Sequence, residues 1–437
     1  MADTRHAMRR NGFDHILRPR LDPFRLAPMA RLLATAILLL LALDLEAQPA
    51  GAVERLGQHY QVSPSDLPDL YATPAVANPP EKVPRPSARA LEVPEGFAVD
   101  AFATGLADAR WLATAPDGDV FLAEPDPGKI TLLRDEKGGG KATLVTTFAG
   151  GFDRPHGLAF HGGYLYVADI ERVWRIPYRD GALKAEAAPE PVTAAGALGS
   201  GFGHWTRDIA FRPDGSGFYV AIGSASNIGE DPSPRATIQE FGASGKAQRT
   251  FASGLRNPVG IAFHPATGEL FAVVNERDGM GDDLVPDFLA HVERGAFYGW
   301  PYAYIGAHPQ PGYGEKRPDL VAKTVVPDLL FRSHSAPLGL VFYTGGQFPE
   351  RYRGDAFVAL HGSWNSSEPR GYAVVHVPFE NGRPVGGYEN FVTGFWVAGE
   401  KRAQVWGRPV GLAIAKDGSL LIADDVSQSI WRVSYPR

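Results

Sequence analysis

An internal repeat constrains the fold of this chain more than any other feature of its sequence. Each copy has a polar lead-in, an apolar strand resembling G-[LI]-A-F, a turn often written P-D-G, and a second strand that usually ends in an acid or amide. A hairpin of this kind cannot bury its own faces, so neighbouring copies must stack to share a core. The copies span Arg110–Glu124, Arg154–Asp169, Arg207–Gly223, Arg256–Asn275, Ala336–Leu360 and Arg408–Asp425.

The number of copies predicts an all-β fold, a six-bladed β-propeller. The segments between the copies, such as ITLLRD and IWRVSYP, supply further short strands for each blade. In a propeller the blade loops converge on a central, funnel-shaped site. The 50 glycines and 37 prolines agree with many turns and few long helices. A β-sandwich is the alternative, but it would leave the repeat unexplained.

The chain divides into three parts by composition. Residues 1–47 read as a signal peptide, because Arg25 and Arg31 precede an apolar run over 32–43 that ends near small residues at Ala47. The run is too short to span a bilayer, and Met29 is an alternative start. Residues 48–94 form a Pro-rich linker or strap, with partner docking as a further hypothesis. We therefore expect 95–437 to be the propeller domain of a periplasmic or secreted protein without a membrane span after cleavage.

Composition excludes several function classes. The chain has no cysteine, which excludes disulfides, thiolate metal sites and thiol catalysis. Its net charge of −6 would become more negative without residues 1–47, where basic residues outnumber acidic ones. An acidic exported domain is a poor nucleic-acid binder, so we expect no nucleic-acid partner.

The fourth repeat carries the densest set of polar residues. Arg256 and Asn257 precede its first strand, and the polar loop 275–283 follows its second. An antiparallel hairpin returns both groups to one rim. A guanidinium, an amide and a cluster of oxygens suit an anionic ligand bridged by calcium. A solvated turn with surface charges is the alternative for this segment taken alone.

The lead-ins of the other repeats bring further candidates to the same rim. His204 in GHWTRD is the first choice for a general base, since a neutral imidazole accepts a hydroxyl proton near neutral pH. His156 and His334 are the runners-up. In the loop HGSWNSSEPRG, which begins at His361, Trp364 could stack on a planar ligand and Arg370 could pair with a carboxylate.

Several motifs in series resemble the soluble quinoprotein glucose/sorbosone dehydrogenases. They are the order of the repeats, GHWTRD, GLRNPVGIAF, NERDGMGDD and AFYGWP, and the resemblance covers most of residues 95–437. It implies a six-bladed propeller that binds pyrroloquinoline quinone (PQQ) and calcium and oxidises sugars, polyols or aldehydes. The H-x-T-R form at His204 is closer to the sorbosone and pyranose dehydrogenase branch.

The resemblance also implies a role for each candidate residue. His204 would be the base, and the carbonyl groups of Asp278 and Gly279 would hold calcium. Hydride would pass from the substrate to the quinone and then to an electron acceptor that the sequence does not identify. Trp406 and Phe152 depart from the glucose enzymes, so glucose specificity does not follow. The implied cofactor-binding residues are Arg207, Arg256, Asn257, His334, Trp364, Arg370 and Arg408.

Two other functions are compatible with the same fold. A calcium-dependent hydrolase such as a lactonase could use the acids and amides that close the second strands, if these converge on one metal. A non-enzymatic binding propeller is the other alternative, because fold alone does not determine function. The rim arginines favour the dehydrogenase over the hydrolase, since a small neutral lactone does not require so many cations. The closing residues are Glu124, Asp169, Asn275 and Asp424.

Overall fold

Antiparallel sheets make up nearly all regular structure in the residues that the computed structural model describes, 53–86 and 91–436. The expected signal peptide lies outside these residues. The predicted all-β class is confirmed: only one short α-helix and three 3₁₀ turns occur in the described part of the chain. These are α2 (Pro318–Val321), η1 (Pro64–Asp66), η2 (Gly314–Lys316) and η3 (Glu350–Tyr352).

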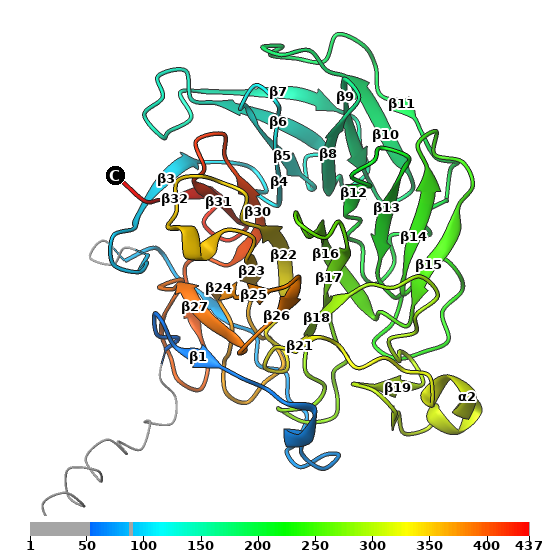
Figure 1. Ribbon diagram of the computed structural model, residues 1–437. Helices are drawn as coiled ribbons and strands as arrows, with labels where there is room; N and C mark the ends of the chain where they lie inside the picture. The colour runs from blue at the N-terminus through cyan, green and yellow to red at the C-terminus, as the bar shows by residue number, and fades with distance from the viewer. Residues whose placement is uncertain (1–52, 87–90, 437) are drawn as a thin grey trace, which may run out of the picture. The chain divides into compact units, whose positions relative to one another are not determined.

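Six of the sheets contain four or five strands each (Figure 1). The first has β4 (Trp111–Thr114), β5 (Val120–Glu124), β6 (Lys129–Arg134) and β7 (Leu144–Gly150), and the second β8 (Gly157–His161), β9 (Tyr164–Ala168), β10 (Val173–Pro177) and β11 (Glu190–Pro191). The third has β12 (Ile209–Phe211), β13 (Gly217–Ile222), β14 (Thr237–Gly242) and β15 (Arg249–Ser253), and the fourth β16 (Asn257–Phe263), β17 (Leu270–Asn275), β18 (Phe288–His291) and β21 (Leu329–Leu330). The fifth has β22 (Pro337–Phe342), β23 (Ala356–Leu360), β24 (Ala373–Val377), β27 (Tyr388–Val392) and β1 (His59–Tyr60), and the sixth β30 (Pro409–Ile414), β31 (Leu420–Asp424), β32 (Ser429–Ser434) and β3 (Ala98–Thr104).

Three smaller sheets complete the described strands. They are formed by β2 (Glu81–Lys82) with β29 (Gln404–Val405) and β28 (Trp396–Ala398), by β19 (Ala303–Tyr304) with β20 (His308–Pro309), and by β25 (Phe379–Glu380) with β26 (Arg383–Pro384).

Each of the six predicted repeats forms the first hairpin of one large sheet. The leading strands β4, β8, β12, β16, β22 and β30 contact one another in that order, and β30 also contacts β4. The sixth sheet joins distant parts of the chain, because β3 pairs with β32 with Ala98 opposite Ser434. This pairing ties the C-terminal strand to a strand that precedes the first repeat.

The glycine of the repeat explains how closely the leading strands approach. A Cβ atom on Gly260 would lie 2.4 Å from the carbonyl oxygen of Leu338, and one on Gly339 would lie 2.3 Å from that of Val410. Similarly, the Gly157 amide donates to the Arg207 carbonyl over 2.8 Å. Side chains larger than hydrogen would therefore push neighbouring sheets apart.

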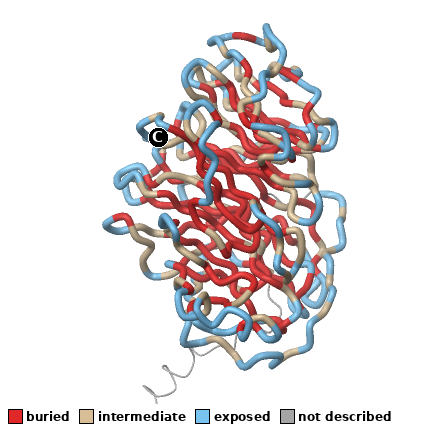
Figure 2. The backbone as a smooth tube through the Cα atoms, turned by 90° about the vertical axis from the view of Figure 1, so that its right-hand side faces the viewer, coloured by how far each residue is buried: buried red, intermediate tan, exposed pale blue. Residues whose placement is uncertain are grey.

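The core lies between the sheets. The second strands are buried along most of their length, and Figure 2 shows buried backbone in the interior with exposed loops around it. One cluster joins Trp111, Leu158, Val259, Leu338 and Val410 from five different leading strands. Apolar burial on this scale fixes the leading strands, so the polar residues at their starts are held on a rigid frame.

Candidate functional site

A cavity of about 230 Å³ lies where leading strands begin and second strands end. Asn257 starts β16 and pairs with Asn275 at the end of β17, as expected for the predicted antiparallel hairpin. Cations, acids, amides and imidazoles line the same space. The predicted residues that line it are His204, Arg256, Asn257, Asp278, His334, Trp364 and Arg408.

His204 presents one free ring nitrogen at this cavity. Its Nδ1 lies 2.9 Å from the carbonyl oxygen of Ser224 and 2.9 Å from the Oγ of the same residue. A carbonyl oxygen can only accept, so Nδ1 carries the proton and Nε2 is left as an acceptor. Burial, with the nearby Arg256 guanidinium, lowers the pKa of His204 to about 3. The imidazole is therefore neutral at neutral pH, as a general base requires.

The runner-up His156 does not line the cavity. It is fully buried beside Trp111, with ring centroids 4.2 Å apart, and burial lowers its pKa well below the ordinary value. Both of its ring nitrogens lack a hydrogen-bond partner among the described residues. His156 is thus packed in the core below the site.

Asn227 connects Arg256 to Asp278. Its Oδ1 accepts from Nη2 of Arg256 and from the Asp278 amide, both over 2.9 Å, and its Nδ2 donates to the Asp278 carbonyl over 2.9 Å. The Arg256 Nη1 also donates to the Glu276 carbonyl over 2.7 Å. Sequence reasoning missed Asn227, which lies between β13 and β14, beyond the lead-ins and closing residues that the repeat singles out.

Asn257 leaves a polar atom without a partner. The side chain is buried, and its Oδ1 accepts no hydrogen bond from the described residues. Opposite it, Asn275 Nδ2 donates to the Pro337 carbonyl over 2.6 Å. A buried unpaired amide oxygen is costly unless a ligand or water bonds to it, so Asn257 marks a place where a ligand donor fits.

His334 and Asp278 form an ionic pair at the cavity wall. The His334 Nδ1 lies 3.6 Å from Asp278 Oδ1, and its Nε2 lies 2.9 Å from the Gly281 carbonyl oxygen. Burial alone would lower the pKa of His334, but the bonds to Asp278 and Gly281 raise it above its ordinary value. His334 is therefore better suited to a charged contact than to the role of base.

Gly279 lies beside this pair but does not line the cavity. Its φ of +99° suits glycine and turns the chain between Asp278 and Met280. Within residues 53–86 and 91–436, no cluster of three or more His, Cys, Asp or Glu side chains could hold a metal ion.

Arg408 is held at the cavity by main-chain oxygens. Its Nε donates to the His361 carbonyl over 2.7 Å and its Nη2 to the Gly362 carbonyl over 2.8 Å. Burial lowers the pKa of Arg408. Arg256 and Arg408 thus bring positive charge to the cavity at the starts of β16 and β30.

Arg110 and His361 also line the cavity, and neither was among the predicted ligand contacts. Both bind Asp425, from Arg110 Nη1 over 2.5 Å and from His361 Nε2 over 3.0 Å. Burial and the Arg408 charge lower the pKa of His361 to about 4. Arg110 could have been found, because it opens the first repeat as Arg256 and Arg408 open theirs.

Two predicted cofactor contacts, Arg207 and Arg370, do not line the cavity. The Arg207 guanidinium is buried and, within 53–86 and 91–436, its hydrogen bonds go to main-chain carbonyls, those of Leu198, Ser200, His204 and Thr206. Arg370 donates from Nη1 to the Asp282 carbonyl over 3.0 Å and to Asp283 Oδ1 over 2.7 Å. Both arginines hold loops beside the cavity through these bonds, and their contact with a cofactor stays a prediction.

The residues proposed for a hydrolytic metal do not converge. Of the four, only Asn275 lines the cavity. Asp169 accepts from the Glu171 and Arg172 amides over 3.0 Å each, and Asp424 accepts from the Val426 amide over 3.0 Å. Glu124 accepts from the Ala107 amide over 2.7 Å. The acids that close the second strands therefore cap turns, which is local chemistry that a repeat reproduces.

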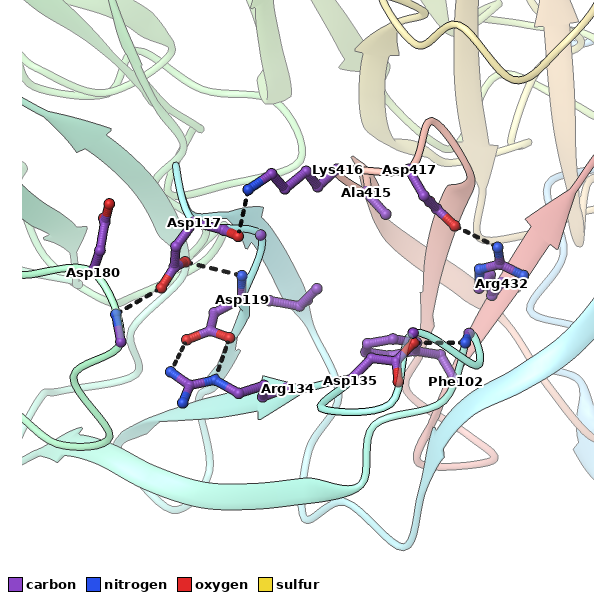
Figure 3. A pocket seen from close by; sticks show the side chains of 15 residues that line it. Phe102, Asp117, Asp119, Arg134, Asp135, Asp180, Ala415, Lys416, Asp417 and Arg432 are labelled. Atoms are coloured by element: carbon purple, nitrogen blue, oxygen red, sulfur yellow. Dashed lines mark hydrogen bonds and ion pairs between the residues drawn. The ribbon is translucent and has the colours of Figure 1, made fainter.

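A larger cavity, of about 720 Å³, lies at the turns of the first and sixth hairpins (Figure 3). Its charges are largely paired with one another. Arg134 bonds Asp119 over 2.6 Å, Arg432 bonds Asp417 over 2.5 Å, and Lys416 donates to the Asp117 carbonyl over 2.9 Å. These pairs hold the hairpin turns together, and the unpaired acceptor and free imidazole that favour a site are in the smaller cavity.

The fold and this cavity define a class of protein: repeated antiparallel sheets around a small site with buried arginines, an unpaired amide oxygen and a neutral histidine. The chain belongs to the TrAA12-like family, whose model matches residues 91–287 and 318–436. A second model, Glucose / Sorbosone dehydrogenase, matches residues 221–363. The resemblance inferred from the motifs is thereby confirmed.

Two curated relatives cover most of the chain. An uncharacterized protein of Borreliella burgdorferi is 28% identical over 358 residues, which is 79% of this chain and 91% of the relative. A pyrroloquinoline quinone-dependent pyranose dehydrogenase of Coprinopsis cinerea is 26% identical over 340 residues, 66% of this chain and 45% of the relative. The chain thus spans less than half the length of that dehydrogenase.

Solved structures agree in fold. The holo form of the pyranose dehydrogenase PQQ domain from Coprinopsis cinerea matches with a TM-score of 0.67 and 22% identity, over 81% of this chain and all (100%) of that one. A Trichoderma reesei enzyme of family AA12 matches with a TM-score of 0.66 and 22% identity, over 79% of this chain and 98% of that one. At 22% identity, these two structures show that the chain shares their fold.

Proposed function

We propose that the protein is a PQQ- and calcium-dependent dehydrogenase that oxidises a sugar, polyol or aldehyde in the cavity around His204. The six large sheets would be the blades of a β-propeller, with the leading strands at its centre. Family membership and the pyranose dehydrogenase relative support the reaction class. The sorbosone-type branch is the finer assignment, which we base on the H-x-T-R sequence at His204.

One observation carries the proposal: an unpaired buried acceptor, buried cations and a neutral histidine share one cavity. Arg256 and Arg408 supply positive charge, Asn257 Oδ1 requires a donor, and His204 Nε2 can accept a proton. An anionic planar quinone matches the cations and the amide. Trp364, which is 50% exposed, offers a face on which such a ring could stack.

The residues present also fit a calcium ion beside the quinone. The Asp278 carbonyl oxygen accepts one bond, from Asn227, and keeps a second lone pair. His334 and Arg256 lower the pKa of the Asp278 carboxyl, although burial acts in the opposite direction, so the carboxylate stays charged. We therefore propose the carbonyls of Asp278 and Gly279 as calcium ligands, with that carboxylate adding negative charge nearby.

The chain's own residues would orient the substrate and move its proton. Bound PQQ would supply an electrophilic carbonyl that accepts hydride, and calcium would polarise that carbonyl. His204 Nε2 would take the proton of the substrate hydroxyl, while Nδ1 stays bonded to Ser224 and keeps the ring in place. Arg256 and Arg408 would stabilise the negative charge that develops on the cofactor side of the cavity.

The cellular setting belongs to the same proposal. We propose export to the periplasm or beyond, with residues 1–47 as the signal peptide and 95–437 as the catalytic domain. No helix among the described residues is long and apolar enough to cross a membrane. An electron acceptor must reoxidise the cofactor after each turnover.

The test is titration of the metal-stripped protein with PQQ, with and without calcium, followed by quinone absorbance. We expect saturable binding that requires calcium, and bleaching on addition of an aldose. Arg256→Ala should weaken binding at least about tenfold, since a charge-assisted contact is lost. Arg432→Ala, which removes a cation from the larger cavity, is the matched control and should bind as wild type. Equal loss in both variants, or no binding by wild type, would reject the proposal.

A further inference from the structure

Residues 53–86, here called the strap, lie outside the stretch that matches the family model, which begins at residue 91. The strap pairs with strands of the fourth sheet, the fifth sheet and the small sheet that contains β29. Its β1 pairs with β27 at an outer edge (Figure 1), Val62 bridges to Leu330, and β2 pairs with β29. The strap therefore precedes the part of the chain that the family model covers and pairs with strands inside that part.

The middle of the strap reaches the loop that carries Asp278. This acidic loop, residues 276–287, connects β17 to β18. The Tyr71 amide donates to the Met280 carbonyl over 3.2 Å, and the Asp282 amide donates to Thr73 Oγ1 over 2.7 Å. A Cβ atom on Gly281 would lie 2.9 Å from the Thr73 carbonyl oxygen, so glycine permits the close approach.

The strap next reaches the loop that carries Trp364. This tryptophan loop, residues 361–372, connects β23 to β24. The Asn78 amide donates to the Trp364 carbonyl over 2.6 Å. The Asn78 side chain donates from Nδ2 to the Ser366 carbonyl over 2.9 Å and to the Lys401 carbonyl over 2.7 Å. The Asn78 side chain thus binds the main chain of two segments, at Ser366 and at Lys401.

The two loops are also bonded to each other where they border the cavity. Asn365 Nδ2 donates to Asp278 Oδ1, and the Ser367 amide donates to Asp282 Oδ1 over 2.8 Å. Asp278, Trp364 and Asn365 all line the cavity. The strap, the acidic loop and the tryptophan loop therefore form one hydrogen-bonded rim on that side of the site.

Polar bonds rather than burial hold this part of the strap. None of residues 69–82 is buried, and the side chain of Tyr71 is 59% exposed. Segments with few buried apolar contacts open at low free-energy cost. Single side-chain changes in the strap should therefore loosen the rim without unfolding the sheets.

We propose that Thr73 and Asn78 are positioning residues that fix the acidic and tryptophan loops and thereby set which substrates the cavity accepts. The inference rests on the proposed function only in placing the substrate at this cavity. Because Trp364 and Asp278 are held through main-chain bonds, loss of the strap bonds would widen the range of rim positions. A larger sugar would then lose less affinity than a small one that must contact both loops.

The experiment compares Thr73→Val, Thr73→Ser and Asn78→Ala with wild type. Hydrogen exchange of the metal-stripped protein is followed in peptides covering 276–287 and 361–372. KM and kcat for D-glucose and cellobiose are measured on the PQQ- and calcium-loaded protein with an artificial acceptor. His59→Ala is the matched control, since His59 contacts the Gly386 carbonyl at the far end of the strap.

We expect exchange in both loops to rise about five- to tenfold in Thr73→Val and Asn78→Ala, as the loss of one or two hydrogen bonds predicts. KM for D-glucose should rise several-fold with kcat nearly unchanged, and the ratio of KM values for the two sugars should shift. Thr73→Ser keeps the hydroxyl acceptor and should restore wild-type values, and His59→Ala should match wild type.

Two results would overturn the inference. Unchanged exchange in both loops would show that the strap does not hold the rim. Faster exchange with unchanged KM values for both sugars would show that the strap bonds do not affect substrate selectivity. Failure of wild type to bind PQQ would refute the proposed function instead, and the exchange measurements, which need no cofactor, would still decide whether Thr73 and Asn78 position the loops.

Discussion

Replacing Arg207 by Met separates the positioning role that the structure assigns to this residue from the cofactor contact expected from sequence. The guanidinium has four carbonyl acceptors. Two of them, on Ser200 and His204, also accept from Arg235 over 2.7 and 3.1 Å. The carbonyls of Leu198 and Thr206 have no second side-chain donor in the part of the chain that the structure describes, so the substitution leaves those two unsatisfied.

The cost of Arg207→Met follows from these two carbonyls. A buried acceptor without a partner costs about 1–3 kcal/mol, so the free energy of unfolding should fall by about 4 kcal/mol. For a domain of this size that corresponds to a decrease in Tm of about 5–6 °C. Burial lowers the pKa of Arg207 to about 9, so the side chain is charged at neutral pH and the lost bonds are charge-assisted.

The assay is thermal unfolding of the metal-stripped protein, followed by PQQ titration of the folded variant. We expect a large decrease in Tm, together with a decrease in turnover because the chain around His204 loses a main-chain anchor. Arg175→Met is the control, since the exposed pair of Arg175 with Glu190 is worth at most about 1 kcal/mol. An unchanged Tm with weakened PQQ binding would refute the positioning role and restore Arg207 as a cofactor contact.

Three further predictions follow from the same geometry. His204→Ala should bind PQQ yet lose about 10²–10⁴-fold in kcat. Because the pKa of His204 is about 3, the kcat/KM of the wild type should stay constant from pH 7 to pH 5. A decrease in kcat/KM with a midpoint near pH 6.5 would contradict this assignment. Asn227→Ala should weaken calcium-dependent PQQ binding by about tenfold in titration, since Arg256 and Asp278 lose their shared partner; wild-type affinity would reject that link. Gly260→Ala should lower stability by about 1–3 kcal/mol in denaturant unfolding, whereas Gly139→Ala, with open space at its Cβ, should not; equal stability would contradict close strand contact.

The rim residues at repeat positions could be predicted because the repeat itself places them. Arg256, Asn257 and Arg408 stand at equivalent lead-ins and line one cavity, whereas Arg207, at the lead-in of the third repeat, does not. Arg207 and Arg370 also lie near motifs, yet their guanidinium groups turn to carbonyl and carboxylate oxygens of neighbouring loops. Which way a long side chain points depends on unsatisfied acceptors around it, and these are set by loops whose sequence carries no periodic signal.

The sequence by itself determined the architecture. Alternating apolar residues and turn signals require hairpins that stack, because none can bury its own faces. In four of the six repeats a glycine permits the close approach of neighbouring leading strands. The tertiary structure decided which polar groups share a cavity, through bonds between segments far apart in the chain. Asn227 joins Arg256 to Asp278, Asp425 joins Arg110 to His361, and Asn78 reaches Ser366, in each case because a buried or bridging polar group must find a partner in space rather than in sequence.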